Sequence, residues 1–225
     1  MTASTLHLIF ESAGYFVGGQ LFWWQRRRLG DTVEGSTRWL VIGTAIFGAA
    51  MGSRVLAALE DPAHFSLLGK TIVGGLLGGL IGVELMKKAL GITQRTGDLF
   101  AIPLAVGTAV GRIGCWMAGL EDQTHGLPTT MPWGYDYGDG VRRHPTQLYE
   151  VAFCLTLAVV LTRIHLPQPG DRFKLFMVAY MAWRLLIDFL KPGVAMAGLT
   201  AIQWAALACL IYYATDIRRW LTSHG

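Results

Sequence analysis

Charged residues are scarce in this sequence. They make up 15% of it, whereas hydrophobic residues make up 52% and the mean hydropathy is +0.41. A soluble globular domain carries about 25% charged residues, so this composition excludes that class. We expect an all-α integral membrane protein instead. The 225 residues leave room for about seven spans of ~20 residues with short loops, so residues 1–225 should form a single polytopic membrane domain.

Cysteine is also scarce, and its placement is informative. Cys115, Cys154 and Cys209 all lie in apolar runs, so we expect no disulfide framework. The first basic residue is Arg26, which follows the first apolar run, and a cleavable signal peptide with a basic leading region is therefore not expected. The sequence contains no internal repeat and no low-complexity segment. No pattern in it predicts a metal site or a cofactor.

Apolar runs that end where charges, glycine or proline gather predict seven transmembrane helices. The expected spans are 4–24, 38–58, 67–87, 98–119, 146–164, 173–190 and 197–215. Lysine and arginine are in excess in the loops on one side of these spans, as is typical of cytoplasmic loops. The amino terminus and the loop 120–145 should therefore face outward, and the carboxyl terminus should face the cytoplasm. The net charge of +4 fits this topology and anionic lipid rather than nucleic acid.

Six charged residues fall in the outer halves of the predicted spans. They are Arg54, Arg112, Arg184, Glu11, Glu150 and Asp188. An ionisable group at membrane depth is costly unless it is paired or has a function. Structural ion pairs between helices are the alternative for any one of these residues, but such pairs would have no reason to share a single leaflet. The pattern favours an outer-leaflet cavity in which arginines hold an anionic head group, with phosphate as the natural ligand.

The loop 120–145 has a composition of its own. It contains too many glycines and prolines to be a helix. Trp133, Tyr135 and Tyr137 suit the membrane–water interface, where amphipathic rings settle, and Trp116 can join them. This outward-facing loop between the fourth and fifth spans is either a head over the entrance to a site or a passive interfacial belt.

Two helical patterns lie outside that loop. The glycines of residues 74–82 allow close approach of helix backbones, and helix packing alone is the favoured explanation. Tyr180, Arg184 and Asp188 recur every four residues, which places a phenol, a guanidinium and a carboxylate on one helical face. Arg184 and Asp188 can also simply pair, and Tyr180 can be a packed ring with a satisfied hydroxyl.

From about the third span onward, the chain resembles the prolipoprotein diacylglyceryl transferase family. The matching pieces are GGLIG at 78–82, GRIGC at 111–115, Gly126, HPTQLYE at 144–150, YMAWRLLIDF at 180–189 and Gln203. The resemblance implies a seven-span enzyme of the bacterial inner membrane, with its amino terminus in the periplasm. It also implies transfer of a diacylglyceryl group from phosphatidylglycerol to a lipobox cysteine thiol, with release of glycerol phosphate. The implied partners are phosphatidylglycerol or another anionic phospholipid and the signal region of a prolipoprotein.

Residue by residue, the resemblance implies that Arg112 and Arg184 hold the phosphatidylglycerol head group. Tyr180 and Gly126 match required residues, and Asp188 stands where the family usually has Glu. Tyr15 corresponds to a tyrosine of the first span. The complete set of substrate-binding candidates is Arg112, Arg184, Asp188, Gly126, Tyr15, Gln147 and Arg54, and the catalytic candidates are His144, Glu150 and Tyr180.

The sequence departs from the family at two positions. Leu77 replaces a histidine proposed to activate the acceptor thiol, and Cys115 replaces an asparagine. If thiol activation is lost, the chain is instead a phospholipid-binding or lipid-moving protein that keeps the head-group clamp.

An enzyme would need another base, and His144 is the first choice because its unperturbed pKa suits the task. The alternatives are Glu150, His125 and Asp122, and His144 can also be an interfacial cap. Cys115 is either a covalent nucleophile or a small packing residue, of which the packing role is favoured.

Overall fold

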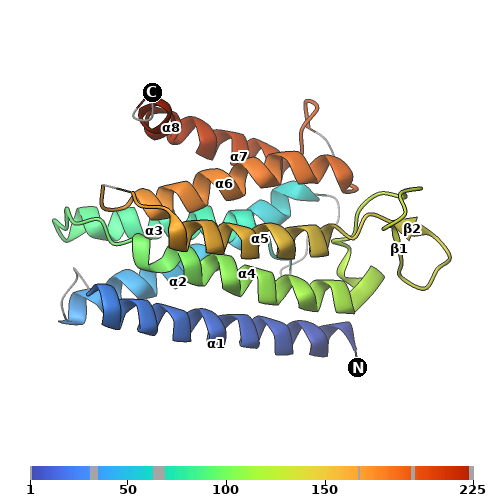
Figure 1. Ribbon diagram of the computed structural model, residues 1–225, viewed down its shortest axis with the longest axis horizontal. Helices are drawn as coiled ribbons and strands as arrows, with labels where there is room; N and C mark the ends of the chain where they lie inside the picture. Colours follow the sequence, from blue (N-terminus) through green and yellow to red (C-terminus); the bar gives the residue numbers. More distant parts are fainter. Residues whose placement is uncertain (1, 31–34, 63–68, 167, 194–195, 223–225) are drawn as a thin grey trace. The chain divides into compact units, whose positions relative to one another are not determined.

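The computed structural model describes residues 2–30, 35–62, 69–166, 168–193 and 196–222, which form eight α-helices and one short hairpin (Figure 1). The helices are α1 (Ala3–Leu29), α2 (Gly35–Glu60), α3 (Ile72–Ala89), α4 (Asp98–Ala118), α5 (Thr146–Arg163), α6 (Asp171–Ile187), α7 (Ala201–Tyr212) and α8 (Ala214–Thr222). Two 3₁₀ turns, η1 (Gly119–Asp122) and η2 (Asp188–Leu190), follow α4 and α6. The hairpin pairs β1 (Tyr135–Asp136) with β2 (Arg142–Arg143) in antiparallel fashion.

Helices α1 to α7 coincide with the seven expected spans, with ends displaced by a few residues. Within the described residues, three segments are long and apolar enough to cross a membrane, namely Thr37–Glu60, Asp98–Asp122 and Thr146–Arg163. The all-α class and the membrane character are therefore confirmed. That all seven helices cross the membrane stays a prediction. The short helix α8 was not expected, because the seventh apolar run ends where it begins.

The described residues divide into two compact units, and each is described by itself. Unit 1 comprises Met1–Gly30, Gly97–Ala179 and Phe189–Pro192. Unit 2 comprises Asp31–Thr96, Tyr180–Asp188 and Gly193–Gly225. Unit 1 therefore holds α1, α4, α5, the hairpin and the first part of α6. Unit 2 holds α2, α3, the last part of α6, α7 and α8. That the whole chain acts as a single membrane domain stays a prediction.

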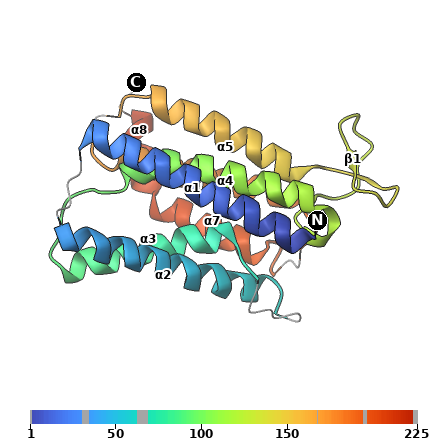
Figure 2. The same ribbon diagram turned by 90° about the horizontal axis from the view of Figure 1, so that it is seen from below.

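In unit 1, α1 packs along α4, and α4 packs along α5 (Figure 2). The first pair depends on small residues: a Cβ added to Gly14 would lie 2.8 Å from the carbonyl oxygen of Gly107, and one added to Gly114 would lie 2.5 Å from Cβ of Phe10. The carboxylate of Asp98 accepts hydrogen bonds from the backbone N–H groups of Gly170 and Phe173, at 2.7 and 3.1 Å. This link fastens the start of α6 to the start of α4.

In unit 2, α2 and α3 lie side by side with unusually close backbones (Figure 2). A Cβ added to Gly48, Gly52, Gly74 or Gly78 would meet a backbone carbonyl oxygen of the opposite helix. Such close approach requires glycine on both helices, since any larger residue would push them apart. The glycine run of α3 is therefore a helix-packing surface, in agreement with the favoured explanation.

Candidate functional site

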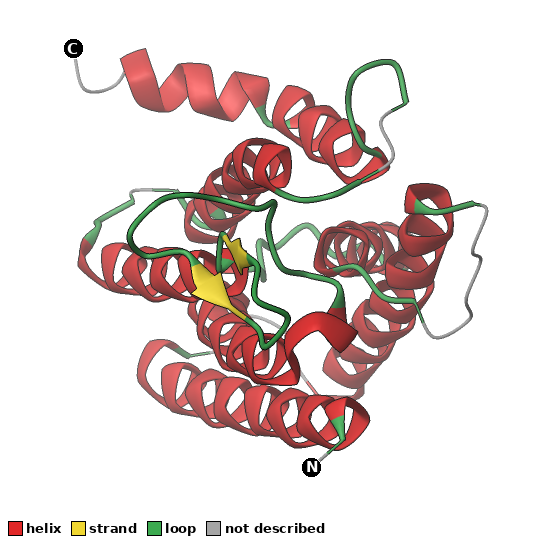
Figure 3. Ribbon diagram, turned by 90° about the vertical axis from the view of Figure 1, so that its right-hand side faces the viewer, coloured by secondary structure: helices red, strands yellow, loops and turns green. Residues whose placement is uncertain are grey.

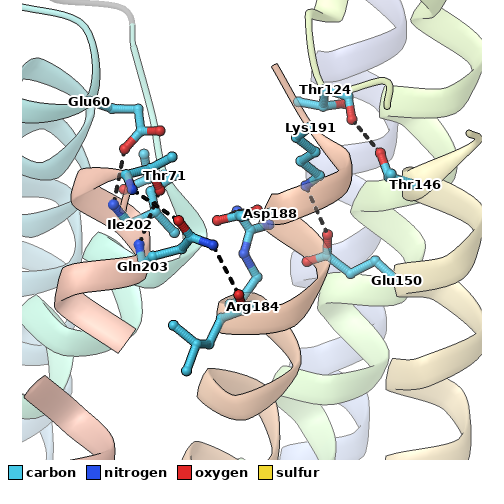
Figure 4. A network of polar contacts seen from close by, with 12 residues as sticks. Glu60, Thr71, Thr124, Thr146, Glu150, Arg184, Asp188, Lys191, Ile202 and Gln203 are labelled. Atoms are coloured by element: carbon cyan, nitrogen blue, oxygen red, sulfur yellow. Dashed lines mark hydrogen bonds and ion pairs between the residues drawn. The ribbon is translucent and has the colours of Figure 1, made fainter. Parts of the chain in front are cut away.

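A largely buried group of three charged side chains joins α4, α5 and the segment that follows η2, all in unit 1. Nε of Arg112 lies 2.9 Å from Oε2 of Glu150. Nζ of Lys191 lies 3.8 Å from the same oxygen, and Figure 4 shows this second contact. Glu150 is fully buried and Arg112 is 6% exposed. Pairing explains how these charges are tolerated inside the protein. The formal charges of the three side chains sum to +1, which favours an anionic ligand in their vicinity.

Gly126 lies where three segments of unit 1 meet. Its N–H donates to the carbonyl oxygen of His144 at 2.9 Å, and the N–H of Leu127 donates to that of Leu190 at 2.7 Å. A Cβ on Gly126 would lie 2.6 Å from Cβ of His144, 2.8 Å from its carbonyl oxygen and 2.9 Å from the carbonyl oxygen of Leu190. Leu190 directly precedes Lys191. The glycine is therefore required by a close backbone approach that fixes both Lys191 and the entry to α5.

The first turn of α5 is fixed by side-chain contacts. Nδ1 of His144 lies 3.2 Å from the hydroxyl of Tyr149, and the hydroxyl of Thr146 donates to the carbonyl oxygen of Thr124 at 2.7 Å. Gln147 is 1% exposed, and its Oε1 accepts a hydrogen bond from the Tyr137 hydroxyl at 2.9 Å. Its Nε2 is buried with no hydrogen-bond partner among the described residues. Because buried donors are nearly always satisfied, this amide can serve an oxygen atom of a ligand.

The hairpin organises the loop of residues 120–145, called the head loop below (yellow strands in Figure 3). The carboxylate of Asp136 accepts hydrogen bonds from the backbone N–H groups of Gly138, Asp139 and Gly140, which closes the turn. The Arg143 guanidinium, 2.8 Å from Asp139, holds the pKa of that carboxyl below its ordinary value. Asp139 in turn raises the pKa of Arg143. The turn is thus built from polar contacts rather than from an apolar core.

A line of packed rings connects α4 to the head loop. The ring centroid of Trp116 lies 5.5 Å from that of Tyr135, which lies 4.9 Å from that of Tyr137. His125 continues the line, 5.9 Å from Tyr137. Burial raises the pKa of Tyr137 to about 12, and burial together with the Arg143 charge lowers the pKa of His125, which keeps that imidazole neutral at pH 7. Tyr135, Tyr137 and His125 thus form one line of packed rings with Trp116 of α4, and the role of this loop as a head over the entrance to the site stays a prediction.

In unit 2, Arg184 and Asp188 form the pair that their spacing allows. Nη2 of Arg184 lies 2.8 Å from Oδ1 and 3.1 Å from Oδ2 of Asp188, and both residues are buried. Tyr180 lies one helical turn before Arg184 and is also fully buried. The structure therefore places the expected phenol, guanidinium and carboxylate in succession at the end of α6.

The start of α7 supports this end of α6. Gln203 forms a capping box with Thr200, and its Nε2 donates to the carbonyl oxygen of Leu185 at 3.0 Å (Figure 4). The carboxylate of Glu60, at the end of α2, accepts a hydrogen bond from the N–H of Ile202 at 3.0 Å. Gln203, noted in the sequence only as a matching residue, thus acts as a structural support for the Arg184 segment.

Two predicted site residues do not join these buried polar groups. Tyr15 is 79% exposed on α1. Arg54 is exposed, and its Nη1 donates to the carbonyl oxygen of Ala50 on its own helix at 3.0 Å. Arg112 belongs to unit 1 and Arg184 to unit 2, so their joint action on one head group stays a prediction.

Two residues of interest were missed in the sequence. Neither Lys191 nor His7 was predicted to belong to a site. Nε2 of His7 lies 2.6 Å from Oδ1 of Asp122, although the two residues are far apart in the chain. The available signal for His7 was an ionisable side chain within an apolar run, the same signal that identified Arg112.

The structure thus defines a helical membrane protein with buried, ion-paired side chains on α4, α5 and α6. Residues 9–220 match the family described as prolipoprotein diacylglyceryl transferase, and the chain belongs to that family. The resemblance inferred from the motifs is therefore confirmed, and the match extends it to α1 and α2.

Curated relatives carry the name phosphatidylglycerol–prolipoprotein diacylglyceryl transferase. The relative from Bordetella bronchiseptica is 30% identical over 213 residues, which cover 83% of this chain and 80% of the relative. The relative from Nitratidesulfovibrio vulgaris strain DP4 is 29% identical over 230 residues, which cover 92% and 86%. Because the matches cover most of both chains, the similarity concerns the whole architecture rather than a single motif.

Proposed function

We propose that this chain transfers a diacylglyceryl group from phosphatidylglycerol to the cysteine thiol of a prolipoprotein and releases glycerol phosphate. Relatives about 30% identical to it are named for this activity. The observation that carries the proposal is the buried group of Arg112, Glu150 and Lys191, in which two cations share one carboxylate. A phosphate diester is an anion that suits such a group.

In this mechanism Arg112 and Arg184 hold the phosphate of the donor lipid. Glu150 orients the first guanidinium and Asp188 the second, at 2.9 and 2.8 Å. When the carbon–oxygen bond breaks, the phosphate gains a second negative charge, and fixed cations stabilise that developing charge. Planar guanidinium groups suit two phosphate oxygens at once, which a lysine ammonium does not.

Three further residues position the donor. Gln147 offers its buried Nε2 to an oxygen of the lipid. Gly126 holds the entry to α5 and the segment of Lys191 together, so it acts on the site through the backbone. Tyr180 lies one turn before Arg184, and its hydroxyl donates a hydrogen bond to the leaving glycerol phosphate. Tyr15 and Arg54 have exposed side chains and are assigned to the outer approach of the lipid rather than to the clamp.

His144 is the proposed base for the acceptor thiol. Nδ1 of His144 lies 3.2 Å from the Tyr149 hydroxyl, and in the tautomer in which the Nδ1–H donates to that oxygen, Nε2 is unprotonated and can take the proton. Glu150 is less suited because its carboxylate already contacts Arg112 and Lys191. The head loop, residues 120–145, and the amino terminus would lie on the periplasmic side of the inner membrane, with the carboxyl terminus in the cytoplasm.

Purified protein with labelled phosphatidylglycerol and a lipobox peptide tests the proposal. Release of glycerol phosphate should match the gain of a diacylglyceryl mass on the peptide. Arg112→Gln should lower the initial rate about 10²–10³-fold, the usual cost of removing one group that stabilises a developing anion. Arg95→Gln, in an exposed loop, serves as the control. Binding of phosphatidylglycerol without release by the wild type would instead support the lipid-binding alternative, which the absence of a histidine at Leu77 favours.

A further inference from the structure

His7, Cys115 and Asp122 meet in unit 1 from three different elements. His7 lies on α1, Cys115 near the end of α4, and Asp122 at the end of η1. Nε2 of His7 lies 2.6 Å from Oδ1 of Asp122, and Cys115 offers its Sγ beside these two residues. One ligand atom from each residue lies within 4.8 Å of the other two. A nitrogen, a sulfur and an oxygen donor thus converge on one point.

This donor set suits a borderline-soft divalent ion such as Zn²⁺. Zinc binds Cys sulfur at about 2.3 Å and His nitrogen or Asp oxygen at about 2.0–2.2 Å, so tetrahedral ligand atoms lie about 3.3–3.6 Å apart. Side-chain shifts of about 1 Å therefore suffice to bring the three atoms to these distances. The hydroxyl of Thr124 donates to the second oxygen of Asp122, an outer contact that orients metal-binding carboxylates.

The charges around the cluster also permit a cation. A thiolate and a carboxylate together neutralise a divalent ion, so Arg112, whose Nη1 lies 3.8 Å from Sγ of Cys115, faces no net positive charge. Cys115 is only partly buried, whereas Cys154 and Cys209 are buried. Three protein ligands leave one tetrahedral position for an outside ligand, as in catalytic zinc sites.

We propose that His7, Cys115 and Asp122 bind a zinc-like divalent ion, and that its open position takes the thiol of the acceptor cysteine. This inference rests on the proposed function, which requires a thiol to attack close to Arg112. A free thiol has a pKa of about 8.5 and is mostly protonated at neutral pH. A thiol that coordinates a metal ion is deprotonated outright, so the ion prepares the nucleophile beside the residue that holds the donor phosphate.

The step balances in atoms and charge. Coordination releases the thiol proton to the imidazole of His144, and from there to solvent. The thiolate sulfur then forms a bond to the glyceryl carbon that carries the phosphate. The carbon–oxygen bond breaks, and its electron pair leaves on the phosphate oxygen. One thiolate and one diester monoanion give a neutral thioether and the dianion of glycerol phosphate, and the ion is not consumed.

Cobalt substitution tests the site directly. The full-length protein in lipid nanodiscs is stripped with a chelator and titrated with Co²⁺, and the sulfur-to-cobalt charge-transfer absorption is recorded in the near ultraviolet. The absorption should saturate at about one Co²⁺ per chain and disappear when Zn²⁺ is added. Cys115→Ser should abolish it, whereas the matched control Cys154→Ser should retain it. His7→Ala and Asp122→Asn should each weaken Co²⁺ binding at least about tenfold.

Adding the lipobox peptide to the cobalt protein should increase the absorption, because a second thiolate joins the ion. The absence of any absorption that depends on Cys115 would overturn the metal site and leave an ordinary His7–Asp122 ion pair. Full transfer activity in metal-free protein would also overturn the inference while the proposed function stands. Cobalt binding through Cys115 without any release of glycerol phosphate would uphold the site and refute the proposed function instead.

Discussion

Replacing Gly126 with alanine isolates the role of backbone packing beside the candidate site. The added Cβ would lie 2.6–2.9 Å from three atoms, and two of these are the backbone carbonyl oxygens of His144 and Leu190. Backbone atoms cannot rotate away as the end of a side chain can. The three segments must therefore separate, and Leu190 carries Lys191 with it.

The magnitude follows from the contacts. Overpacking of this kind costs about 1–3 kcal/mol. Weakening the two hydrogen bonds, from Gly126 to His144 and from Leu127 to Leu190, adds about 0.5–1.5 kcal/mol for each that is lost. We expect Gly126→Ala to lower the free energy of unfolding by about 2–4 kcal/mol. If half of that cost, about 1–2 kcal/mol, appears at the transition state, the initial rate should fall about 5- to 30-fold, because each 1.36 kcal/mol is tenfold in rate.

Two measurements separate the effects. Thermal unfolding followed by circular dichroism reports stability, and release of labelled glycerol phosphate reports the rate. Gly19→Ala is a suitable control, because nothing lies within 4 Å of a Cβ added to Gly19 in α1. A Gly126→Ala protein that unfolds at the same temperature as the Gly19→Ala protein and keeps its activity would refute the packing argument.

Three other changes have distinct expected outcomes. Arg184→Lys should lower turnover strongly, because an ammonium cannot replace the planar guanidinium, whose Nη2 lies 2.8 Å from Asp188. Unchanged initial rates would exclude a bidentate clamp on the phosphate. Leu77→His should raise the rate with a lipobox peptide, and a rate equal to that of the wild type would show that α3 takes no part in thiol activation. Thr129→Cys should react with an impermeant maleimide from the periplasmic side, and labelling from the cytoplasmic side alone would reverse the proposed topology.

Much of the helical architecture could be predicted because a membrane requires long apolar runs. Helix α8 was not predicted, because a short amphipathic helix after the last apolar run does not need to be apolar throughout. Asp216, Arg218 and Arg219 interrupt its apolar residues. The hairpin was not predicted, because each strand has only two residues and its turn depends on the side chain of Asp136.

The sequence predicted at which level of a helix each charged side chain lies, but not the direction in which that side chain points. Counting residues along a helix gives the level of a charge, and on that basis Arg54 and Arg112 looked equivalent. The direction of a side chain depends on which helix packs against it. Packing buries Arg112 against Glu150, whereas Arg54 folds back on α2. His7 was not predicted as a site residue, because its partner Asp122 lies in a distant segment and no local spacing in the sequence links the two.

The pairing of Arg112 and Lys191 with Glu150 has a consequence for affinity. These groups lose most of their hydration as the chain folds, so an arriving phosphate would not have to remove that water again. The carboxylate acts as a resident counterion that keeps the cations in place between reaction cycles. Without this carboxylate the two cations repel each other, so Glu150→Gln should give a less stable empty protein that gains more stability from added phosphatidylglycerol.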